Sequence, residues 1–275
     1  VPESSSPPPL PSDDPVLAQI ERTGVLKVAL RQDTAPFGYV DEDSEWVGYC
    51  RDFARDLQAH LAQEMRLRGQ SMTVDLVELS STVSDRFSLV DQVIEHVECG
   101  PNTIRQDVDG VVFSNPLWVT GPQFLVKQAD VNRINPNVSL DGVRVAVLPN
   151  TSTEQFVQQT YADAEVIVFD SPSGRQDTIR ALADGLVDAV VSDGILAISE
   201  VQRQNLEPSA FTLVPELPLS CGFYGLILPE ADTEWQELVN EFLGDTHNIR
   251  LTRHLPEDRL QEQVVLLDYC LNSSG

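Results

Sequence analysis

The sequence predicts an α/β protein of two lobes that are joined by a two-strand hinge, with a ligand cleft between them. Short apolar runs alternate with helical patterns twice along the 275 residues, in a first block ending at Cys99 and a second block beginning near residue 129. Such alternation is typical of mostly parallel sheets that are covered by helices. Two segments, 121–128 and 219–229, are placed to carry the chain from one block to the other.

These blocks divide the chain into three parts. Residues 1–15 are rich in Pro, Ser and acidic residues and bury little apolar surface, so we expect a flexible tether. The first lobe is expected to consist of residues 16–126 together with 222–275, because the C-terminal helices return to it. The second lobe is expected at residues 127–221.

The elements of the first block follow from local patterns. Apolar Phe53, Leu57 and Leu61 recur at helical spacing within segment 49–66. The expected elements are a short helix at 16–24, a strand at 26–30, a loop at 31–46, the helix at 49–66, a strand at 73–79, a helix near 84–95 and a strand ending at 99.

The second block repeats this pattern. Its buried strands are the apolar runs GVRVAVLP, AEVIVFD and VDAVVSD, and each of the first two precedes a helical segment. The expected elements are strands at 142–149, 164–170 and 187–193, helices at 150–162 and 174–185, then a strand at 221–229 and helices near 232–243 and 257–269.

Charge and cysteine content narrow the classes of partner. The formal net charge of −25 argues against nucleic acid and anionic membrane surfaces as partners. Arg outnumbers Lys strongly, and Arg forms two-pronged bonds with carboxylates. The four cysteines form no C-x-x-C pair and the histidines are scattered, so we expect no metal site. Four cysteines allow two disulfides in three connectivities, or four free thiols.

Several polar and aromatic residues lie at expected strand ends. The stretch HVECGPNTIR (96–105) leaves a strand through Gly-Pro, which suits either a small polar ligand or an ordinary tight turn. Arg31 lies just past the carboxyl end of the first strand, where open α/β sheets bind ligands. Phe37 and Trp118 lie in loops beside strand ends, where they either wall a pocket or pack in the core.

In the second block, VLPNTSTE predicts a capping box, with Thr151 at the helix start and Glu154 three residues later. A helix start also attracts anions, so capping alone and anion binding both stay open. VVSDGI ends a strand on Asp193, whose carboxylate either binds an ammonium group or caps the next helix. No nucleophile–base, Walker or dinucleotide motif occurs, so we do not expect an enzyme.

From about residue 20 to about 265, the order of motifs resembles the type II periplasmic solute-binding proteins for amino acids, the bacterial extracellular solute-binding protein family 3. Ionotropic glutamate receptor ligand cores share this fold. Arg31 before APFGY, and Arg86 before the E-C-G triplet ending at Gly100, look most like the glutamate/aspartate-binding branch. The motifs are GVLKVALRQDTAPFGYVDEDSEWVGYCRDFARDL, FSNPLWVTGPQFLVK, LDGVRVAVLPNTSTEQF, ALADGLVDAVVSDG and GFYGLILP.

The resemblance implies roles for individual residues of the first lobe. Arg31 and Arg86 would face an acidic ligand side chain, while Pro101 and Thr103 would meet the α-amino and α-carboxylate groups. The family usually clamps the α-carboxylate with an Arg in a T-x-x-x-x-R pattern. This chain departs from that pattern, and Arg105 is the candidate substitute.

From the second lobe, the resemblance implies that Thr151 and Ser152 donate to a ligand carboxylate and that Asp193 receives the ammonium group. Arg175 stands where the glutamate/aspartate branch has a His, which keeps a cation beside an acidic ligand.

The implied function is that of a non-catalytic, extracytoplasmic or periplasmic "Venus-flytrap" binding protein without a cofactor. It would capture an amino acid, either an acidic one (glutamate or aspartate) or a polar one, by hinge closure, and deliver it to the membrane subunits of an ABC-type importer. We expect a monomer that is lipid-anchored through its N-terminal tether. Two alternatives stay open: a sensor domain of a membrane receptor or channel, and a dehydratase-like enzyme that uses a cleft carboxyl group.

Overall fold

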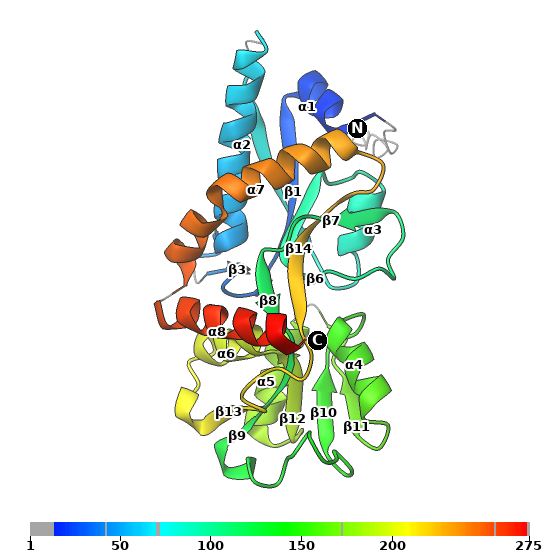
Figure 1. Cartoon of the computed structure of the whole chain (residues 1–275), viewed down its shortest axis with the longest axis vertical. Helices are drawn as coiled ribbons and strands as arrows, with labels where there is room; N and C mark the ends of the chain where they lie inside the picture. The colour runs from blue at the N-terminus through cyan, green and yellow to red at the C-terminus, as the bar shows by residue number, and fades with distance from the viewer. Residues whose placement is uncertain (1–13, 42, 70–71, 172, 256, 274–275) are drawn as a thin grey trace, which may run out of the picture.

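The computed structural model of the chain describes residues 14–41, 43–69, 72–171, 173–255 and 257–273. The predicted tether at residues 1–15 lies almost wholly outside these residues. The described chain forms two α/β lobes, each built on its own mixed sheet (Figure 1), which confirms the predicted fold class.

The first lobe is built on a sheet with the strand order β5-β1-β6-β14-β7, to which β8 adds by pairing with β14. Strand β1 runs parallel to β5 and β6, whereas β14 is antiparallel to β6, β7 and β8. The strands are β1 (Val25–Arg31), β5 (Asp75–Ser81), β6 (Val97–Thr103), β7 (Val111–Phe113), β8 (Trp118–Thr120) and β14 (Gly222–Pro229).

Helices and a small second sheet complete this lobe. The helices are α1 (Val16–Thr23), α2 (Tyr49–Leu67), α3 (Arg86–Asp91), α7 (Thr233–His254) and α8 (Glu257–Ser273). The expected loop at 31–46 contains the small sheet, formed by β2 (Asp33–Thr34), β3 (Gly38–Val40) and β4 (Trp46–Val47).

The second lobe is built on a sheet with the strand order β11-β10-β12-β9-β13. Strand β10 is parallel to β11 and β12, and β9 is antiparallel to β12 and β13. Its elements are β9 (Pro122–Lys127), β10 (Arg144–Val147), β11 (Glu165–Val168), β12 (Ala189–Asp193), β13 (Phe211–Val214), α4 (Ser152–Thr160), α5 (Gly174–Asp184), α6 (Gly194–Arg203) and the 3₁₀ turns η1 (Gln128–Asp130) and η2 (Pro208–Ala210).

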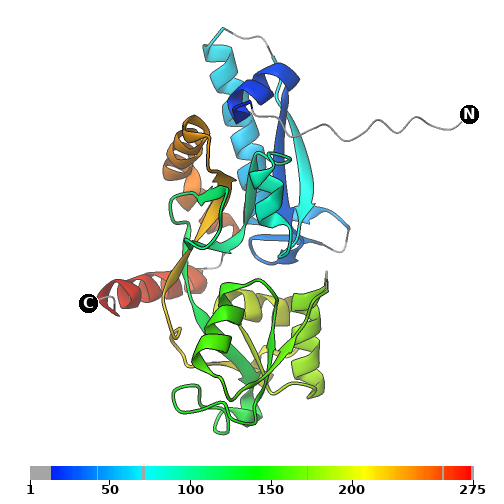
Figure 2. The same cartoon turned by 90° about the vertical axis from the view of Figure 1, so that its right-hand side faces the viewer.

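The chain crosses between the lobes twice, and the two crossings lie side by side (Figure 2). The first crossing lies at Gly121, between β8 and β9, and the second leads through Ser220 into β14. A Cβ at Gly121 would collide with the Ser220 carbonyl oxygen, so the close approach of the crossings requires glycine. The lobe boundary that we expected after residue 126 lies several residues C-terminal to the crossing, because β9 pairs with β12 in the second sheet from Pro122 onward.

Two predicted helices differ in length from the structure. The helix expected near 84–95 is the short α3, because Val93 takes a left-handed backbone conformation (φ 51°) and the chain must be extended again by Val97. The helix expected at 232–243 continues to His254 as α7. In α2 the predicted apolar stripe of Phe53, Leu57 and Leu61 is fully buried in the first-lobe core.

All four cysteines form disulfides, Cys50–Cys99 and Cys221–Cys270. The first joins α2 to β6 inside the core of the first lobe, and the second joins the start of β14 to α8. Among the helices of the described chain, none is both long and apolar enough to cross a membrane.

Candidate functional site

Most of the predicted site residues meet in one pocket between the two sheets. The pocket contains about 550 Å³ of space, part of it open to solvent, and residues of both lobes line it. Residues 37, 100 and 118 do not line it. The predicted residues that do are Arg31, Arg86, Pro101, Thr103, Arg105, Thr151, Ser152, Arg175 and Asp193.

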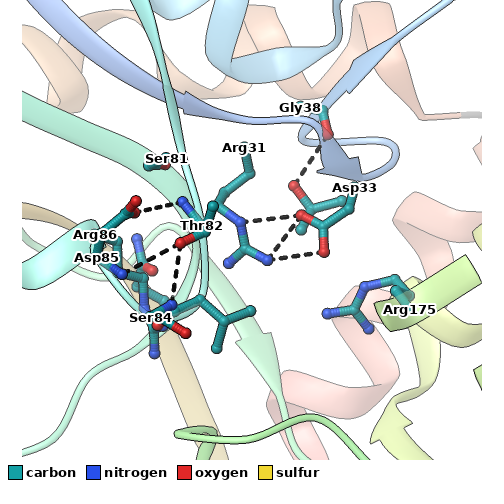
Figure 3. A network of polar contacts seen from close by, with 12 residues as sticks. Arg31, Asp33, Gly38, Ser81, Thr82, Ser84, Asp85, Arg86 and Arg175 are labelled. Atoms are coloured by element: carbon teal, nitrogen blue, oxygen red, sulfur yellow. Dashed lines mark hydrogen bonds and ion pairs between the residues drawn. The ribbon is translucent and has the colours of Figure 1, made fainter. Parts of the chain in front are cut away.

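Arg31 enters the pocket from the end of β1, but it already has a partner. Its Nε donates to Asp33 Oδ1 at 3.0 Å and its Nη2 donates to Asp33 Oδ2 at 2.9 Å. Figure 3 shows this pair, with Arg175 of the second lobe pointing toward it. The sequence prediction missed Asp33, although the alternation R-x-D at the end of a strand was a visible signal.

Beneath the pocket lies a second residue that sequence reasoning missed as a participant, Glu98. Its fully buried carboxylate accepts a hydrogen bond from Ser81 Oγ at 2.9 Å and another from the Asn102 amide. A Cβ at Gly100 would lie 2.9 Å from both Arg31 Cγ and Glu98 Oε1. Gly100 therefore admits this carboxylate and the arginine stem together. Burial raises the pKa of Glu98, while the charge of Arg31 opposes that shift.

Arg86, from the start of α3, is buried and donates only to backbone carbonyls. Its Nη1 donates to Val83 O, and its Nη2 reaches across to the second lobe to donate to Asn150 O at 3.1 Å. Its buried Nε has no hydrogen-bond partner. Burial, followed by the charge of neighbouring Arg31, lowers the pKa of Arg86 to about 9.

The segment after β6 forms the rest of the first-lobe wall. Pro101 lines the pocket, and the Nε of Arg105 lies 3.2 Å from Asp107 Oδ1. The Asp107 carboxylate also accepts a weak bond of 3.4 Å from Gln155 of the second lobe. Arg105 is therefore turned toward the pocket rim, where an aspartate already balances its charge.

The start of α4 faces the pocket from the second lobe. Thr151 Oγ1 accepts from the Glu154 amide at 3.1 Å, and Glu154 Oε2 accepts from the Asn150 amide at 2.8 Å. Capping is thus present as predicted. Ser152 Oγ donates to Thr103 Oγ1 of the first lobe at 3.1 Å, so the two walls already touch here.

Arg175 and Asp193 complete the second-lobe wall. Arg175 Nη1 donates to Ser192 Oγ at 2.9 Å, and its buried Nε has no hydrogen-bond partner. The Asp193 carboxylate accepts a short hydrogen bond from Tyr224 of β14, whose hydroxyl oxygen accepts in turn from Thr120 at 3.3 Å. Burial raises the pKa of the Asp193 carboxyl above its ordinary value.

Phe37 and Trp118 lie in the first-lobe core beside the hinge. Their rings meet edge to face with centroids 5.7 Å apart, and Phe37 also packs on Tyr49 and Tyr224 at 6.5 and 5.5 Å. Of the two readings left open by the sequence, the structure supports core packing for both aromatic residues. Their contribution to the site is to support Tyr224, which bonds to Asp193.

The arginines around the pocket differ in whether a carboxylate pairs with them. Arg31 and Arg105 pair with aspartates, whereas no described carboxylate forms an ion pair with Arg86 or Arg175. The described residues also contain no cluster of His, Cys, Asp and Glu that could hold a metal ion. The pocket therefore offers two guanidinium groups that have no ion-pair partner among the described carboxylates, one on each lobe, and one buried carboxylate.

Two α/β lobes, two adjacent crossings and a polar pocket lined from both sides define a two-lobed solute-binding protein. The chain belongs to the bacterial extracellular solute-binding proteins, family 3, whose family model matches residues 26–251.

Relatives with different named ligands are similar to this chain at nearly the same level. The L-cystine-binding protein TcyJ of Escherichia coli is 26% identical over 194 residues, covering 70% of this chain and 68% of the relative. The glutamate/aspartate import solute-binding protein of Salmonella typhimurium is 25% identical over 236 residues, covering 85% and 76%. The arginine-bound, truncated ArgBP structure from T. maritima is 26% identical with a TM-score of 0.71, covering 83% and 99%. These comparisons do not single out the glutamate/aspartate branch.

Two further relatives carry other functions in their names. Virulence sensor protein BvgS of Bordetella bronchiseptica is 27% identical over 228 residues, which make up 82% of this chain but 17% of the sensor. Cyclohexadienyl dehydratase of Pseudomonas aeruginosa is 23% identical over 247 residues, covering 89% and 86%.

Proposed function

We propose that this protein is an extracytoplasmic binding protein that captures an acidic amino acid, glutamate or aspartate, for an ABC-type importer. The observation that carries this proposal is the pair Arg86 and Arg175. Both guanidinium groups are buried, both keep a buried Nε without a partner, and neither forms an ion pair with a described carboxylate. Buried cations of this kind favour a ligand that brings its own carboxylates.

A ligand with two carboxylates and one ammonium group matches the remaining polar groups. In this proposal Asp193 binds the ammonium group, and its bond from Tyr224 holds the carboxylate in place. The start of α4, where the hydroxyls of Thr151 and Ser152 face the pocket, receives one carboxylate together with Arg86. Arg175 receives the other.

Arg31 takes a different part from the one that the resemblance implied. The Asp33 carboxylate accepts two hydrogen bonds from the Arg31 guanidinium, so Arg31 is a structural residue at the bottom of the pocket. The Arg31–Asp33 pair faces Arg175. Pro101 and Thr103 form the strand-end wall against the ligand backbone, and Arg105 closes the rim.

Hydrogen bonds between the lobes support a mechanism of hinge closure. Ser152 with Thr103, Asp193 with Tyr224 and Arg86 with the Asn150 carbonyl all join the lobes around the pocket. A ligand that bonds to both walls favours this closed arrangement over an open one.

The two disulfides fit an oxidising, extracytoplasmic compartment. We expect the mature protein to work as a monomer, tethered through its N-terminal segment, and to meet the importer's membrane subunits through its lobes. Pull-down of the importer subunits by the ligand-loaded protein, but not by the ligand-free one, would test this part.

Calorimetric titration with L-glutamate, L-aspartate and L-glutamine tests the proposed ligand class. We expect both acidic ligands to bind the purified, ligand-stripped protein. We expect Arg86→Ala to weaken L-glutamate and L-glutamine to a similar extent, because both carry the α-carboxylate. Unchanged affinity for both ligands would make Arg86 a structural residue.

One observation favours a second candidate function, an enzyme with a cleft acid. The buried Asp193 carboxyl lies in the pocket with a raised pKa and a tyrosine hydroxyl bonded to it, which is an arrangement suited to proton transfer. Mass spectrometry of the ligand after prolonged incubation separates the two functions: a binding protein returns the amino acid unchanged, and an enzyme returns a product.

A further inference from the structure

Helix α8 is fastened to both segments that cross between the lobes. Gln263 Oε1 accepts a hydrogen bond of 3.3 Å from the Val119 amide of β8, just before the first crossing. Cys270, three residues before the end of α8 at Ser273, is bonded to Cys221, just before β14 in the second crossing. The N-terminal end of α8 follows directly from α7 of the first lobe.

Helix α8 lies on the outer side of the hinge. Figure 2 shows it beside the crossing segments, away from the side on which the lobes face each other. A groove of about 1550 Å³, part of it open to solvent, separates α8 from α6 and β13 of the second lobe. Residues on its two walls include Ile198, Leu213 and Leu217 of the second lobe and Val265 and Leu266 of α8.

The same hinge region reaches the ligand pocket. A smaller cavity is lined by Cys221 and Gly222 together with Thr103, Ser152 and Asp193 of the pocket. A change at the Cys221–Cys270 bond is therefore a change beside the site, although neither cysteine lines the pocket itself.

We propose that α8 is a brace that limits how far the lobes open, and that the Cys221–Cys270 disulfide sets this limit. The inference rests on the proposed hinge closure. A rotation about the crossings that widens the ligand cleft moves α6 and β13 toward α8 on the other side and narrows the groove. With its C-terminal end bonded to Cys221, α8 cannot swing away, so opening stops when the groove is filled.

Loss of the bond therefore favours wider open states and leaves the closed state unchanged. Because ligand affinity scales with the fraction of molecules that can close, the apparent Kd rises. The bond is also the more accessible of the two disulfides, since Cys221 is exposed, whereas Cys50 and Cys99 are at most 1% exposed. A small thiol therefore reaches the hinge disulfide first.

In that reaction a dithiothreitol thiolate attacks the Cys221 sulfur, and the Cys270 thiolate leaves and takes up a proton. The second dithiothreitol thiol then displaces the Cys221 thiolate, which is protonated in turn. The reagent becomes its cyclic disulfide as the protein gains two electrons and two thiols.

The chain offers a matched control. The two disulfides join cysteines that are each 49 residues apart, so removing either one loosens the unfolded chain to the same extent. The test variants are Cys221→Ser with Cys270→Ser, and the control variants are Cys50→Ser with Cys99→Ser. Gln263→Ala removes the hydrogen bond between α8 and β8 without touching a disulfide.

Small-angle X-ray scattering of each protein, with and without L-glutamate, tests the brace. We expect the ligand-free hinge variant to have a larger radius of gyration than wild type, the ligand-saturated variant to match wild type, and its Kd for L-glutamate to rise about three- to tenfold. Gln263→Ala should shift the ligand-free radius in the same direction by less. The core control should lose stability without expanding.

An unchanged ligand-free radius in the hinge variant would overturn the proposal, as would equal expansion in the core control. If the core control does not fold, wild type is compared before and after dithiothreitol reduces the hinge disulfide, with iodoacetamide and mass spectrometry confirming that only Cys221 and Cys270 are labelled. An unchanged ligand-free radius after this reduction would overturn the proposal. If calorimetric titration of wild type with L-glutamate shows no binding, the proposed ligand is wrong. The radii of gyration of the ligand-free proteins still test whether α8 limits opening.

Discussion

Replacing Arg175 with methionine separates the binding of a ligand's side-chain carboxylate from the binding of its amino-acid backbone. Methionine keeps the apolar stem of Arg175 in its buried place and removes the guanidinium group. In wild type that group donates to Ser192 and keeps a buried Nε without a partner. The ligand-free variant should therefore be at least as stable as wild type.

The effect on affinity should depend on the charge of the ligand. With L-glutamate, the loss of one partner of a buried charge pair costs about 2–5 kcal/mol, which is roughly a 30- to 4000-fold rise in Kd. With L-glutamine the variant loses one ordinary hydrogen bond, about 0.5–1.5 kcal/mol. The difference between the two losses, about 2 kcal/mol, measures the contact of Arg175 with the side-chain charge.

Isothermal titration of both ligands into both proteins measures this difference directly. Arg133→Met serves as the control, because Arg133 is half exposed and pairs with Asp130 and Asp188 outside the pocket. It should leave both affinities unchanged. Equal losses for L-glutamate and L-glutamine in Arg175→Met would refute the assignment of Arg175 to the side-chain carboxylate.

Three further predictions concern the pocket and its support. Asp193→Asn should weaken every amino-acid ligand by about 2–5 kcal/mol, since the ammonium group loses its charged partner; titration with unchanged affinity would remove Asp193 from the site. Gly100→Ala should destabilise the fold by about 1–3 kcal/mol, because its Cβ would lie 2.9 Å from Arg31 Cγ, whereas Gly244→Ala, which has open space in α7, should stabilise it by about 0.5–1 kcal/mol. Urea unfolding compares the two, and equal effects would contradict the tight approach at Gly100. Burial raises the pKa of Glu95 from 4.5 to about 7, so the folded state holds this proton more tightly than the unfolded state does. The protein therefore loses stability as the pH rises from 4.5 to 7. Glu95→Gln should stabilise the protein most above pH 7, by at most about 3 kcal/mol, and have little effect near pH 4.5. Urea unfolding at both pH values measures the gain, and the same gain at both would contradict the prediction.

The sequence predicted what local patterns determine. The spacing of Phe53, Leu57 and Leu61 located α2, and Thr151 with Glu154 located the start of α4. Alternation of strands and helices is enough to predict two α/β lobes, because each pattern reports on the burial of one face.

What the sequence left open depends on contacts between distant segments. Strand β9 joins the second sheet because it pairs with β12, about 65 residues later in the chain, and nothing near Pro122 reports that pairing. The cysteine count allowed three connectivities, and only the packing of α2 on β6 places Cys50 beside Cys99.

The candidate site shows the same division. Nine of the twelve predicted residues were brought to one pocket, because strand ends and helix starts meet there. The charge balance was not predictable, because it depends on which arginines already have partners. Arg31 forms an ion pair with Asp33, whereas Arg175 donates a hydrogen bond to Ser192 and forms no ion pair with a described carboxylate.

The most direct test of the proposed function is a thermal-shift screen of the protein after mild unfolding, dialysis and refolding to remove carried-over ligand. The panel holds the twenty amino acids, cystine and common dicarboxylates. A ligand at 100 times its Kd adds about 2.7 kcal/mol of stability, which is easily seen as a rise in Tm. We predict a rise with glutamate and aspartate and little or none with neutral or basic amino acids. A rise confined to cystine, arginine or neutral amino acids, or no rise with any of the panel, would contradict the account.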